Sequence, residues 1–367
     1  MTAVDEHFVT DRRTSKAMAE PGHGNAFTDH LVTARWTRDT GWQRPALGPL
    51  RNLSIHPGMI GLHYAQVIFE GMKAFLQADG SIAVFRPQRN AARFARSAAR
   101  LAMPELPEAL FIESVDRLVR ADAQWLTDNP QHALYLRPLM FGSEANLMLR
   151  ESAEYTFLMM AFLAGGFFGD QVAPVAVMVS HEHTRAVPGG TGDVKCAANY
   201  GPSLLAQRKA QAAGCAQVVW LDATERRWVE EMGGMNLFFV RGNEVSTPRL
   251  TGTLLPGVTR DALLTLAAGA GYRVSEERVS VDDWRAGCRS GVITETFACG
   301  TAAVVTPVGR VRDEGGDFVI STGQAGPVTT RLRTALLDVQ HGRSADPGGW
   351  LHRVSSNRAP QPRQIDP

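Results

Sequence analysis

The chain has 367 residues, of which 44% are hydrophobic and 20% are charged, an ordinary globular composition that is long enough for about two domains. Lysine and arginine number 38 against 37 acidic residues, so the net charge is +1, which argues against nucleic-acid binding through a broad basic surface. The most apolar stretch, residues 156–169, is too short for a membrane-spanning helix and is interrupted by glycines.

The cysteines and the N-terminal sequence bear on the cell compartment. None of the four cysteines lies at CxxC spacing, and a chain of this size does not need disulfides to be stable. The N-terminus lacks the apolar region of a signal peptide. We therefore expect a soluble, cytoplasmic protein without membrane or nucleic-acid partners.

Strand and helix patterns alternate through the N-terminal half. We expect strands at 82–87, 132–141 and 155–163, and helices at 87–103 and about 107–127. In the first helix, Arg89, Arg93, Arg96 and Arg100 follow one another at 4-3-4 spacing. Such a stripe could contact nucleic acid, but at this net charge a solvated helix face is the better interpretation.

The C-terminal half alternates in the same way, which predicts an α/β or α+β fold with two domains. Strands are expected at 173–180, 216–222 and 226–240, a helix within 254–271, a strand within 293–308 and a terminal helix near 327–341. The expected organisation is a flexible N-terminus (1–25), a small N-terminal domain (26–164), an interdomain loop (165–172), a large domain (173–343) and a C-terminal tail (344–367).

Lys195 is the first candidate for chemistry. It lies in the small-residue segment GDVKCAANYGPSLLAQ, which leads into a helix that Gly201 and Pro202 begin and Gly214 ends. Tyr200 follows five residues later, and a lysine held beside a phenol could form a Schiff base with a carbonyl cofactor. An isolated lysine is more often a solvated surface residue, so the interpretation depends on its companions.

Three segments are candidates for binding one phosphate group. The sequence LLPGVTRDALL predicts a helix start at Val258 and Thr259, where free backbone N–H groups attract an anion. Thr301 lies on a small-residue turn after a strand, and Arg86 ends a strand immediately before a proline. Each signal is weak alone, because most such turns and arginines are structural.

The segment RRWVEEMGGMNLFFV places two acidic residues in a strand. Alternation sends Glu230 and Glu231 to opposite faces, so one should be solvated and the other should face inward, where it needs a cationic partner such as a protonated pyridine nitrogen. Gly233 and Gly234 would allow a flat ring to approach the backbone. A bulged strand with two exposed acids explains the segment about equally well.

Six segments in order, LHYAQVIFEGMKAF, LYLRP, KCAANY, VEEMGGMNLFFV, LLPGVTRD and ACGTAAVVTPV, resemble the branched-chain amino-acid aminotransferases. This is a pyridoxal-phosphate family of fold type IV, with a smaller N-terminal α/β domain and a larger C-terminal pseudo-barrel domain. The resemblance extends from about Phe27 to Gln340. It implies transamination of leucine, isoleucine and valine with 2-oxoglutarate, by a homodimer.

The resemblance also implies roles for individual residues. Lys195 matches the Schiff-base lysine, Tyr200 the phenol at the cofactor's own phenolic oxygen, and Glu231 the carboxylate opposite the pyridine nitrogen. The phosphate would be held by Arg86, Thr301 and the amides of Val258 and Thr259. The substrate would meet Phe69, Tyr135 and Phe167 at its side chain, Arg137 at the distal carboxylate of glutamate, the backbone near Thr301 and Ala302 at its α-carboxylate, and Tyr64 from the neighbouring subunit.

Two departures from the family pattern concern substrate preference and redox control. Ala197 and Ala198 stand where two glycines are usual, so their methyl groups could narrow the pocket or be absorbed. Ala303 and Thr306 stand where some members carry a CxxC pair, so we expect no such thiol switch. Alternatives are a D-amino-acid aminotransferase, an aminodeoxychorismate lyase, a pathway-specific aminotransferase and a catalytically silent cofactor-binding protein.

Overall fold

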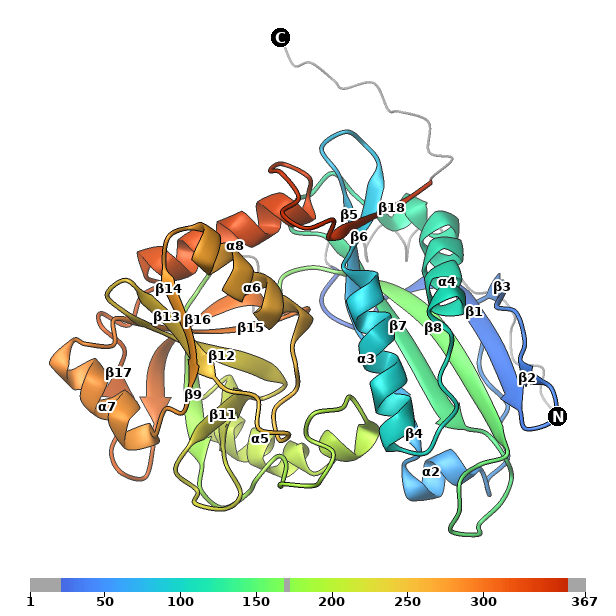
Figure 1. Cartoon of the computed structure of the whole chain (residues 1–367), viewed down its shortest axis with the longest axis horizontal. Helices are drawn as coiled ribbons and strands as arrows, with labels where there is room; N and C mark the ends of the chain where they lie inside the picture. Colours follow the sequence, from blue (N-terminus) through green and yellow to red (C-terminus); the bar gives the residue numbers. More distant parts are fainter. Residues whose placement is uncertain (1–20, 168–171, 356–367) are drawn as a thin grey trace.

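The computed structural model describes residues 21–167 and 172–355. These residues form two nine-stranded sheets that lie side by side, each with helices packed against it (Figure 1). The mixed arrangement of strands and helices confirms the expected α/β (α+β) class. None of the helices in the described ranges is long and apolar enough to cross a membrane.

The N-terminal sheet is antiparallel and has the strand order β18-β6-β5-β7-β8-β1-β2, with β3 beside β1 and β4 beside β7. Its strands are β1 (Phe27–Thr37), β2 (Gly41–Trp42), β3 (Ala46–Pro49), β4 (Val67–Phe69), β5 (Met72–Leu76), β6 (Ile82–Phe85), β7 (Ala133–Gly142), β8 (Glu154–Ala164) and β18 (Leu351–Val354). Its centre is the long pairing of β7 with β8, which places Tyr135 opposite Phe162.

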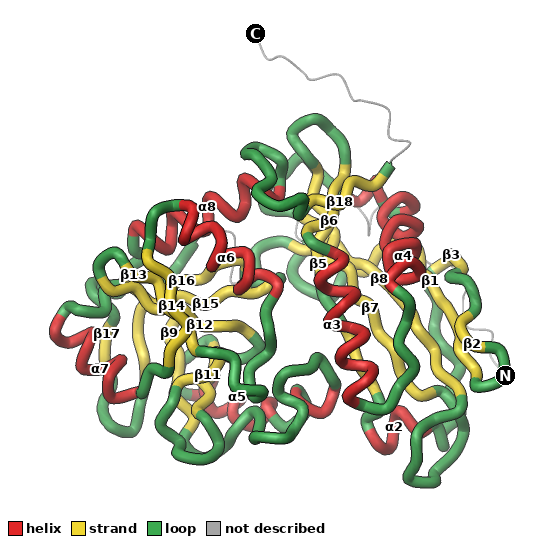
Figure 2. Tube along the Cα trace, viewed as in Figure 1, coloured by secondary structure: helices red, strands yellow, loops and turns green. Residues whose placement is uncertain are grey.

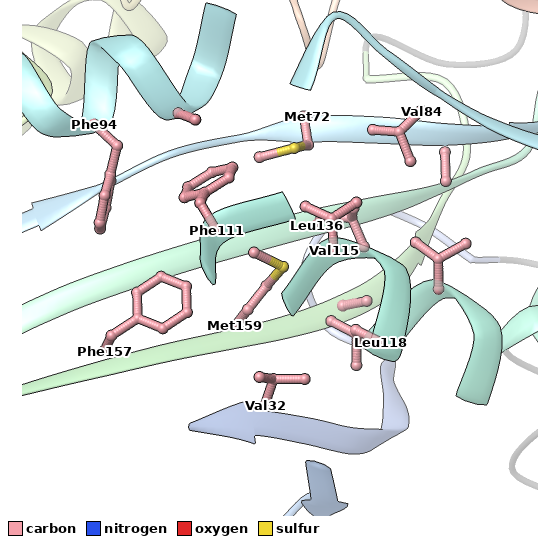
Figure 3. Close-up of a cluster of buried hydrophobic side chains, with 14 of the residues drawn as sticks. Val32, Met72, Val84, Phe94, Phe111, Val115, Leu118, Leu136, Phe157 and Met159 are labelled. Carbon is pink, nitrogen blue, oxygen red and sulfur yellow. The ribbon is translucent and has the colours of Figure 1, made fainter. Parts of the chain in front are cut away.

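Helices α3 and α4 cover one face of this sheet (Figure 1). The helices of this half are α2 (Ile60–Tyr64), α3 (Pro87–Arg100), α4 (Glu108–Ala121) and the 3-10 turn η1 (Ala123–Trp125). Because Pro87 has no N–H to leave unbonded in the first turn, it suits the start of α3. Phe94 of α3 and Phe111 of α4 meet Phe157 of β8 in the buried core (Figure 3).

The C-terminal sheet closes on itself. Its strand order is β11-β10-β9-β16-β15-β12-β13-β14, and β11 also pairs with β12, which joins six strands into a barrel. The strands are β9 (Val175–Ser180), β10 (Gln217–Leu221), β11 (Val229–Met232), β12 (Met235–Arg241), β13 (Glu244–Pro248), β14 (Arg273–Glu277), β15 (Glu295–Gly300), β16 (Val304–Arg312) and β17 (Phe318–Val319). Closure leaves these six strands without a free edge.

Helices surround the barrel strands (Figure 2). They are the 3-10 turn η2 (Ala197–Asn199), α5 (Ser203–Ala212), α6 (Val258–Gly269), α7 (Val281–Ser290) and α8 (Pro327–Gln340). The predicted single strand over 226–240 is wrong, because Gly233, with a φ of +57°, turns the chain between β11 and β12. The helices predicted from Val258 and near 327–341 are confirmed.

Both ends of the described chain contact the N-terminal half. The expectation of a loose tail from residue 344 is wrong for Leu351–Val354, which form β18 and pair with β6. In the segment 21–25, Gly22 O accepts a hydrogen bond from Gly165 N at 3.1 Å, and the expected flexibility of this segment stays a prediction. Residues 1–20, 168–171 and 356–367 lie outside the described residues.

Candidate active site

Lys195 lies where the two halves of the chain meet. Its backbone N–H donates to Ser97 Oγ of α3 at 3.0 Å, and its carbonyl accepts from the N–H of Phe69 in β4 at 3.0 Å. The next residue, Cys196, forms an isolated bridge with Ile68. The segment that carries the lysine therefore belongs to the C-terminal half in sequence but is fixed to the N-terminal sheet by backbone hydrogen bonds.

The amine of Lys195 has a phenol and an aromatic face around it. Its Nζ donates a hydrogen bond to Tyr200 Oη at 2.8 Å. The same nitrogen lies 4.8 Å from the ring centre of Phe69, whose ring centre is 4.8 Å from that of Tyr200. The lysine and tyrosine that the sequence paired are thus in contact, and Phe69 packs against both.

A cavity of about 230 Å³ opens at this amine. Its lining comes from both halves of the chain: Gly71, Arg93, Tyr135, Phe167, Lys195, Tyr200, Gln217, Gly234, Met235, Asn236, Leu255, Gly257, Val258, Thr259, Cys299, Gly300, Thr301 and Ala302. Sequence reasoning named Tyr135, Phe167, Val258, Thr259, Thr301 and Ala302 among these residues, and the fold brings them together around Lys195.

Arg93 is the arginine in this lining. Its Nε and Nη2 donate to the two carboxylate oxygens of Glu70 at 2.6 and 2.9 Å, and its Nη1 donates to Pro256 O at 3.1 Å. Burial by itself raises the pKa of Glu70, but the adjoining Arg93 outweighs it and lowers that pKa below the ordinary value. The interpretation of the arginine stripe as a solvated face is therefore wrong for Arg93, which is buried.

Arg86 lies outside the cavity lining. Its Nη2 donates to Asp261 Oδ2 at 2.6 Å, and its guanidinium stacks 4.7 Å from the ring centre of Trp350. It precedes α3 with a φ of +50°, and its ion pair draws the side chain toward α6. Arg86, expected beside the cofactor phosphate, is therefore absent from the cavity lining, and Arg93, seven residues later, lines the cavity instead.

The start of α6 presents free amides to the cavity. Gly257 caps the helix without a side chain, and Val258 and Thr259 follow it in the lining. A Cβ on Gly257 would lie 2.1 Å from Asn236 Oδ1, so the site requires glycine. Because no side chain bonds to these amides, they remain available to an anion, next to the Arg93 guanidinium.

The carboxylates of Glu230 and Glu231 are both buried, with 5% and 1% of each residue exposed, so the expected solvation of one of them is wrong. The hydroxyl of Thr253 donates to Glu230 and covers it. Glu231 Oε1 accepts from Leu255 N at 2.6 Å, and its Oε2 lies 3.1 Å from Arg185 Nε. Burial raises the pKa of Glu231, and the charge of Arg185 opposes that rise.

The predicted substrate residues form the wall beside this cavity. Tyr135 and Phe167 line it, and the Arg137 guanidinium lies 5.1 Å from the ring centre of Phe69 and 5.4 Å from that of Tyr135. A Cβ on Gly71 would lie 2.0 Å from Tyr135 Oη, so only glycine admits this tyrosine.

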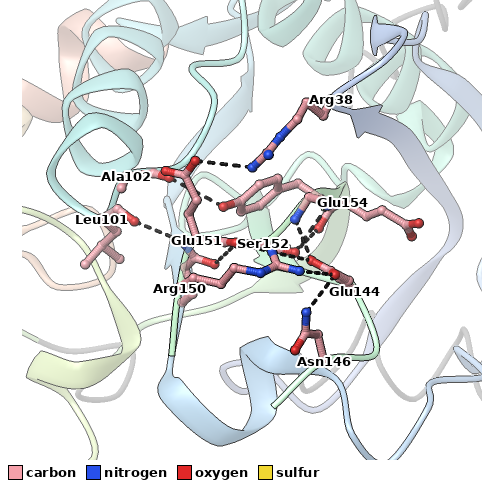
Figure 4. A network of polar contacts seen from close by, with 12 residues as sticks. Arg38, Leu101, Ala102, Glu144, Asn146, Arg150, Glu151, Ser152 and Glu154 are labelled. Atoms are coloured by element: carbon pink, nitrogen blue, oxygen red, sulfur yellow. Dashed lines mark hydrogen bonds and ion pairs between the residues drawn. The ribbon is translucent and has the colours of Figure 1, made fainter. Parts of the chain in front are cut away.

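Tyr64 is 45% exposed and is absent from the cavity lining. Its hydroxyl donates to Leu147 O at 2.8 Å, in the loop between β7 and β8. Glu144 holds this loop by accepting hydrogen bonds from Asn146, Arg150 and the Ala153 N–H (Figure 4). Arg150 beside it lowers the pKa of Glu144 to about 2.

The two alanines that replace the usual glycines lie outside the cavity. Ala198 is exposed, Ala197 is half-buried, and neither contributes to the lining. Their methyl groups are therefore absorbed without narrowing the space next to Lys195.

These residues fit a phosphorylated aldehyde cofactor. Lys195 supplies an amine for the aldehyde, and Tyr200 contacts that amine. Arg93, the α6 amides and Thr301 supply an anion site. Glu231 stands behind Leu255 and Asn236 of the lining, and its carboxylate has lone pairs beyond the hydrogen bonds that it accepts here.

The family model of Amino-transferase class IV matches residues 67–311. The probable branched-chain-amino-acid aminotransferase of Streptomyces coelicolor is 52% identical over 95% of this chain and 97% of its own length. The branched-chain-amino-acid aminotransferase of Mycolicibacterium smegmatis is 50% identical over 95% and 96%.

Solved structures of similar enzymes have the same fold. The Escherichia coli branched-chain amino acid aminotransferase superposes with a TM-score of 0.74 at 28% identity, over 89% of this chain and all of that one. The T.th. branched-chain amino acid aminotransferase, solved with pyridoxamine 5'-phosphate, gives 0.71 at 30% identity, over 88% and 99%. The six motifs thus predicted the family correctly: the chain belongs to the class IV aminotransferases and, among them, to the branched-chain-amino-acid aminotransferase family.

Proposed function

We propose that this protein is a cytoplasmic homodimer that transfers the amino group of L-leucine, L-isoleucine and L-valine to 2-oxoglutarate, using pyridoxal 5'-phosphate bound to Lys195. The observation that carries the proposal is the contact of Lys195 Nζ with Tyr200 Oη, at 2.8 Å, beside a cavity that Arg93 and the start of α6 also line. The two relatives at 50–52% identity are named as a branched-chain-amino-acid aminotransferase and a probable one, which supports the proposed substrates.

The proposed cofactor contacts follow from the lining. Arg93, Thr301 and the Val258 and Thr259 amides would hold the phosphate, so Arg93 replaces Arg86 in the assignment. Tyr200 would stay on the cofactor's phenolic oxygen, and Glu231 would keep the pyridine nitrogen protonated. Bound in this way, the cofactor supplies an electron sink that stabilises negative charge on the substrate Cα.

The proton transfer is assigned to Lys195. Lys195 Nζ would be the base that takes the proton from the substrate Cα. Tyr200 keeps this nitrogen near the reacting atoms through the hydrogen bond that the two residues already make. The same lysine would return the proton in the reverse half-reaction, so one base would serve both directions.

The substrate would lie against Tyr135, Phe167 and Phe69, which offer an apolar wall to a branched side chain. Arg137 beside these rings would receive the distal carboxylate of glutamate, and the backbone at Thr301 and Ala302 the α-carboxylate. An apolar wall with one cation next to it suits both an aliphatic and an acidic partner.

The proposed homodimer is supported by exposed apolar residues around Tyr64. Leu147, Met148 and Leu149 are 55%, 65% and 86% exposed in the loop that Tyr64 contacts. A second subunit would cover these residues, and Tyr64 would then reach the active site of that second subunit. The cytoplasmic location is supported by four cysteines that are free and buried.

The visible absorption spectrum of the purified protein tests the proposal. A yellow band that bleaches on addition of L-leucine alone, and returns on addition of 2-oxoglutarate, is expected. A Lys195→Ala variant should lose turnover entirely, and normal transamination by that variant would contradict the assignment. If the yellow band is present but leucine leaves it unchanged, the cofactor assignment stands and the branched-chain substrate assignment fails.

A further inference from the structure

The first described residues of the chain reach the wall of the active site. Gly165 N donates to Gly22 O at 3.1 Å, and Pro21 is buried against the same glycine, where a Cβ would lie 3.2 Å from Pro21 Cγ. Thr28 Oγ1 then donates to Ala161 O at 3.2 Å. These contacts fix the intervening residue, His23, beside the end of β8.

Three aromatic rings enclose the imidazole of His23. Its ring centre lies 5.3 Å from that of Tyr135, 5.1 Å from that of Phe162 and 4.9 Å from that of Phe167, with interplanar angles of 82° to 85°. Tyr135 and Phe167 also line the cavity that contains Lys195. His23 therefore packs directly behind two of the residues assigned to the substrate side chain.

An imidazole is an unexpected side chain for such a place. Three aromatic rings would pack equally well around an apolar residue, whereas His23 brings two ring nitrogens into the wall. Its Nδ1 is buried and has no hydrogen-bond partner in the described residues. A buried nitrogen without a partner destabilises the fold unless a ligand or water completes it, so it marks a position where a polar group is expected.

The charges around His23 favour an acidic ligand group. Burial, followed by the nearby Lys73 and Arg137, lowers the pKa of His23 to about 4, so the ring is neutral at pH 7 and offers one N–H donor. Lys73 donates to Ala302 O at 3.1 Å, and Arg137 stacks between Phe69 and Tyr135. Neither cation forms an ion pair with a carboxylate of residues 21–167 or 172–355.

We propose that His23 is a specificity-determining residue, which donates a hydrogen bond to a side-chain carboxylate of the substrate next to Arg137. The inference rests on the proposed transamination and narrows its substrate range. Amino acids with an acidic side chain, such as glutamate, gain a second hydrogen-bond donor beside Arg137. Purely aliphatic amino acids leave the His23 nitrogen without a partner and bind less well than they would against an apolar wall.

Two variants separate the polarity of His23 from its packing. His23→Phe fills the aromatic enclosure but removes both nitrogens, and His23→Asn keeps a hydrogen-bond donor of smaller size. Phe162→Leu is the matched control, because it loosens the same enclosure and keeps the imidazole. Thermal melting of each variant first establishes that it is folded.

The measurement is the half-reaction of each holoenzyme with L-glutamate and with L-leucine, followed by bleaching of the yellow band. For His23→Phe, the glutamate concentration that gives half the maximal bleaching rate should rise about tenfold with little change in that maximal rate, because the contact is made equally in the ground and transition states. The corresponding concentration of leucine should stay level or fall. His23→Asn should keep the glutamate-to-leucine preference within about threefold of the wild type, and Phe162→Leu should change both substrates alike.

An unchanged preference in His23→Phe, or an equal loss for both substrates in that variant and in Phe162→Leu, would overturn the inference and leave the proposed function standing. Failure of the wild type to react with either amino acid would instead overturn the proposed function. The two failures are therefore distinguishable in one set of spectra.

Discussion

Arg185 Nε lies 3.1 Å from Glu231 Oε2, and the two side chains are only 6% and 2% exposed. Arg185 Nη2 also donates to Gly192 O at 3.0 Å and to Thr253 O. One arginine thus joins three parts of the site: the carboxylate assigned to the pyridine nitrogen, the segment before Lys195 and the loop before α6. Its charge opposes the rise in the pKa of Glu231 that burial causes.

The Arg185–Glu231 pair predicts strong coupling between substitutions. Arg185→Met leaves a buried carboxylate without its counter-charge, which should cost about 3–5 kcal/mol of folding free energy. The double variant Arg185→Met/Glu231→Gln removes that charge and should recover most of the loss in chemical denaturation, although its turnover stays low. Arg278→Met is the control, because its ion pair with Glu225 is 47% and 48% exposed and is worth under about 1 kcal/mol. Additive losses in the double variant would refute the coupling.

The proposed phosphate contact predicts different effects for two neighbouring arginines. Glu70→Gln/Arg93→Gln removes a buried pair without leaving either charge alone, so the fold should survive. The dissociation constant for pyridoxal 5'-phosphate, measured by titrating the apoenzyme, should rise about 10- to 100-fold because a charged hydrogen-bond donor to the phosphate is lost. Arg86→Gln breaks the contact with Asp261 instead and should change that constant less than about twofold. A larger rise of the dissociation constant in Arg86→Gln than in the double variant would instead assign the phosphate contact to Arg86.

Arg86 and Arg93 also show how much of the fold and the site could be predicted from the sequence. Local patterns predicted α3, the start of α6 and the adjacency of Lys195 and Tyr200, because each depends on residues close together in the chain. The site position of Arg93 depends on Glu70, which is 23 residues away in the link between β4 and β5. A carboxylate in an aromatic, apolar segment needs a buried cation, and that requirement was the available signal.

Two other predictions from the sequence were wrong because they, too, depended on contacts between distant segments. Strand alternation placed one of Glu230 and Glu231 in solvent, but the segment containing Thr253 covers the outer face. The four residues of β18 lie in a sequence rich in glycine and arginine, and they become a strand because the edge of β6 accepts them. Contacts between segments far apart in the chain decided both outcomes, and local sequence patterns carry no signal for them.

The close approach of Gly71 and Tyr135 predicts a severe effect of a small substitution. A Cβ at residue 71 would lie 2.0 Å from Tyr135 Oη and 2.7 Å from its Cζ. Gly71→Ala should therefore displace the Tyr135 ring, with an overpacking loss of about 1–3 kcal/mol and a marked rise in the KM for leucine. Gly48→Ala is the matched control, because nothing lies within 4 Å of the added carbon and this glycine has no positive φ. Equal KM values in the two variants would contradict the role of this contact.

The burial of His23 predicts a pH dependence of stability. The pKa of His23 is lowered from 6.5 to about 4 on folding, so between these values the unfolded chain binds a proton that the folded chain does not. Stability should therefore fall as pH decreases from about 6.5 to about 4, and His23→Phe should lack this contribution. The melting temperature of His23→Phe minus that of the wild type should be constant above about pH 7.5, where His23 is neutral in both states, and grow steadily at lower pH. A difference that stays constant down to about pH 4.5 would show that His23 is not held neutral, and that its ring is more open to solvent than its three aromatic neighbours imply.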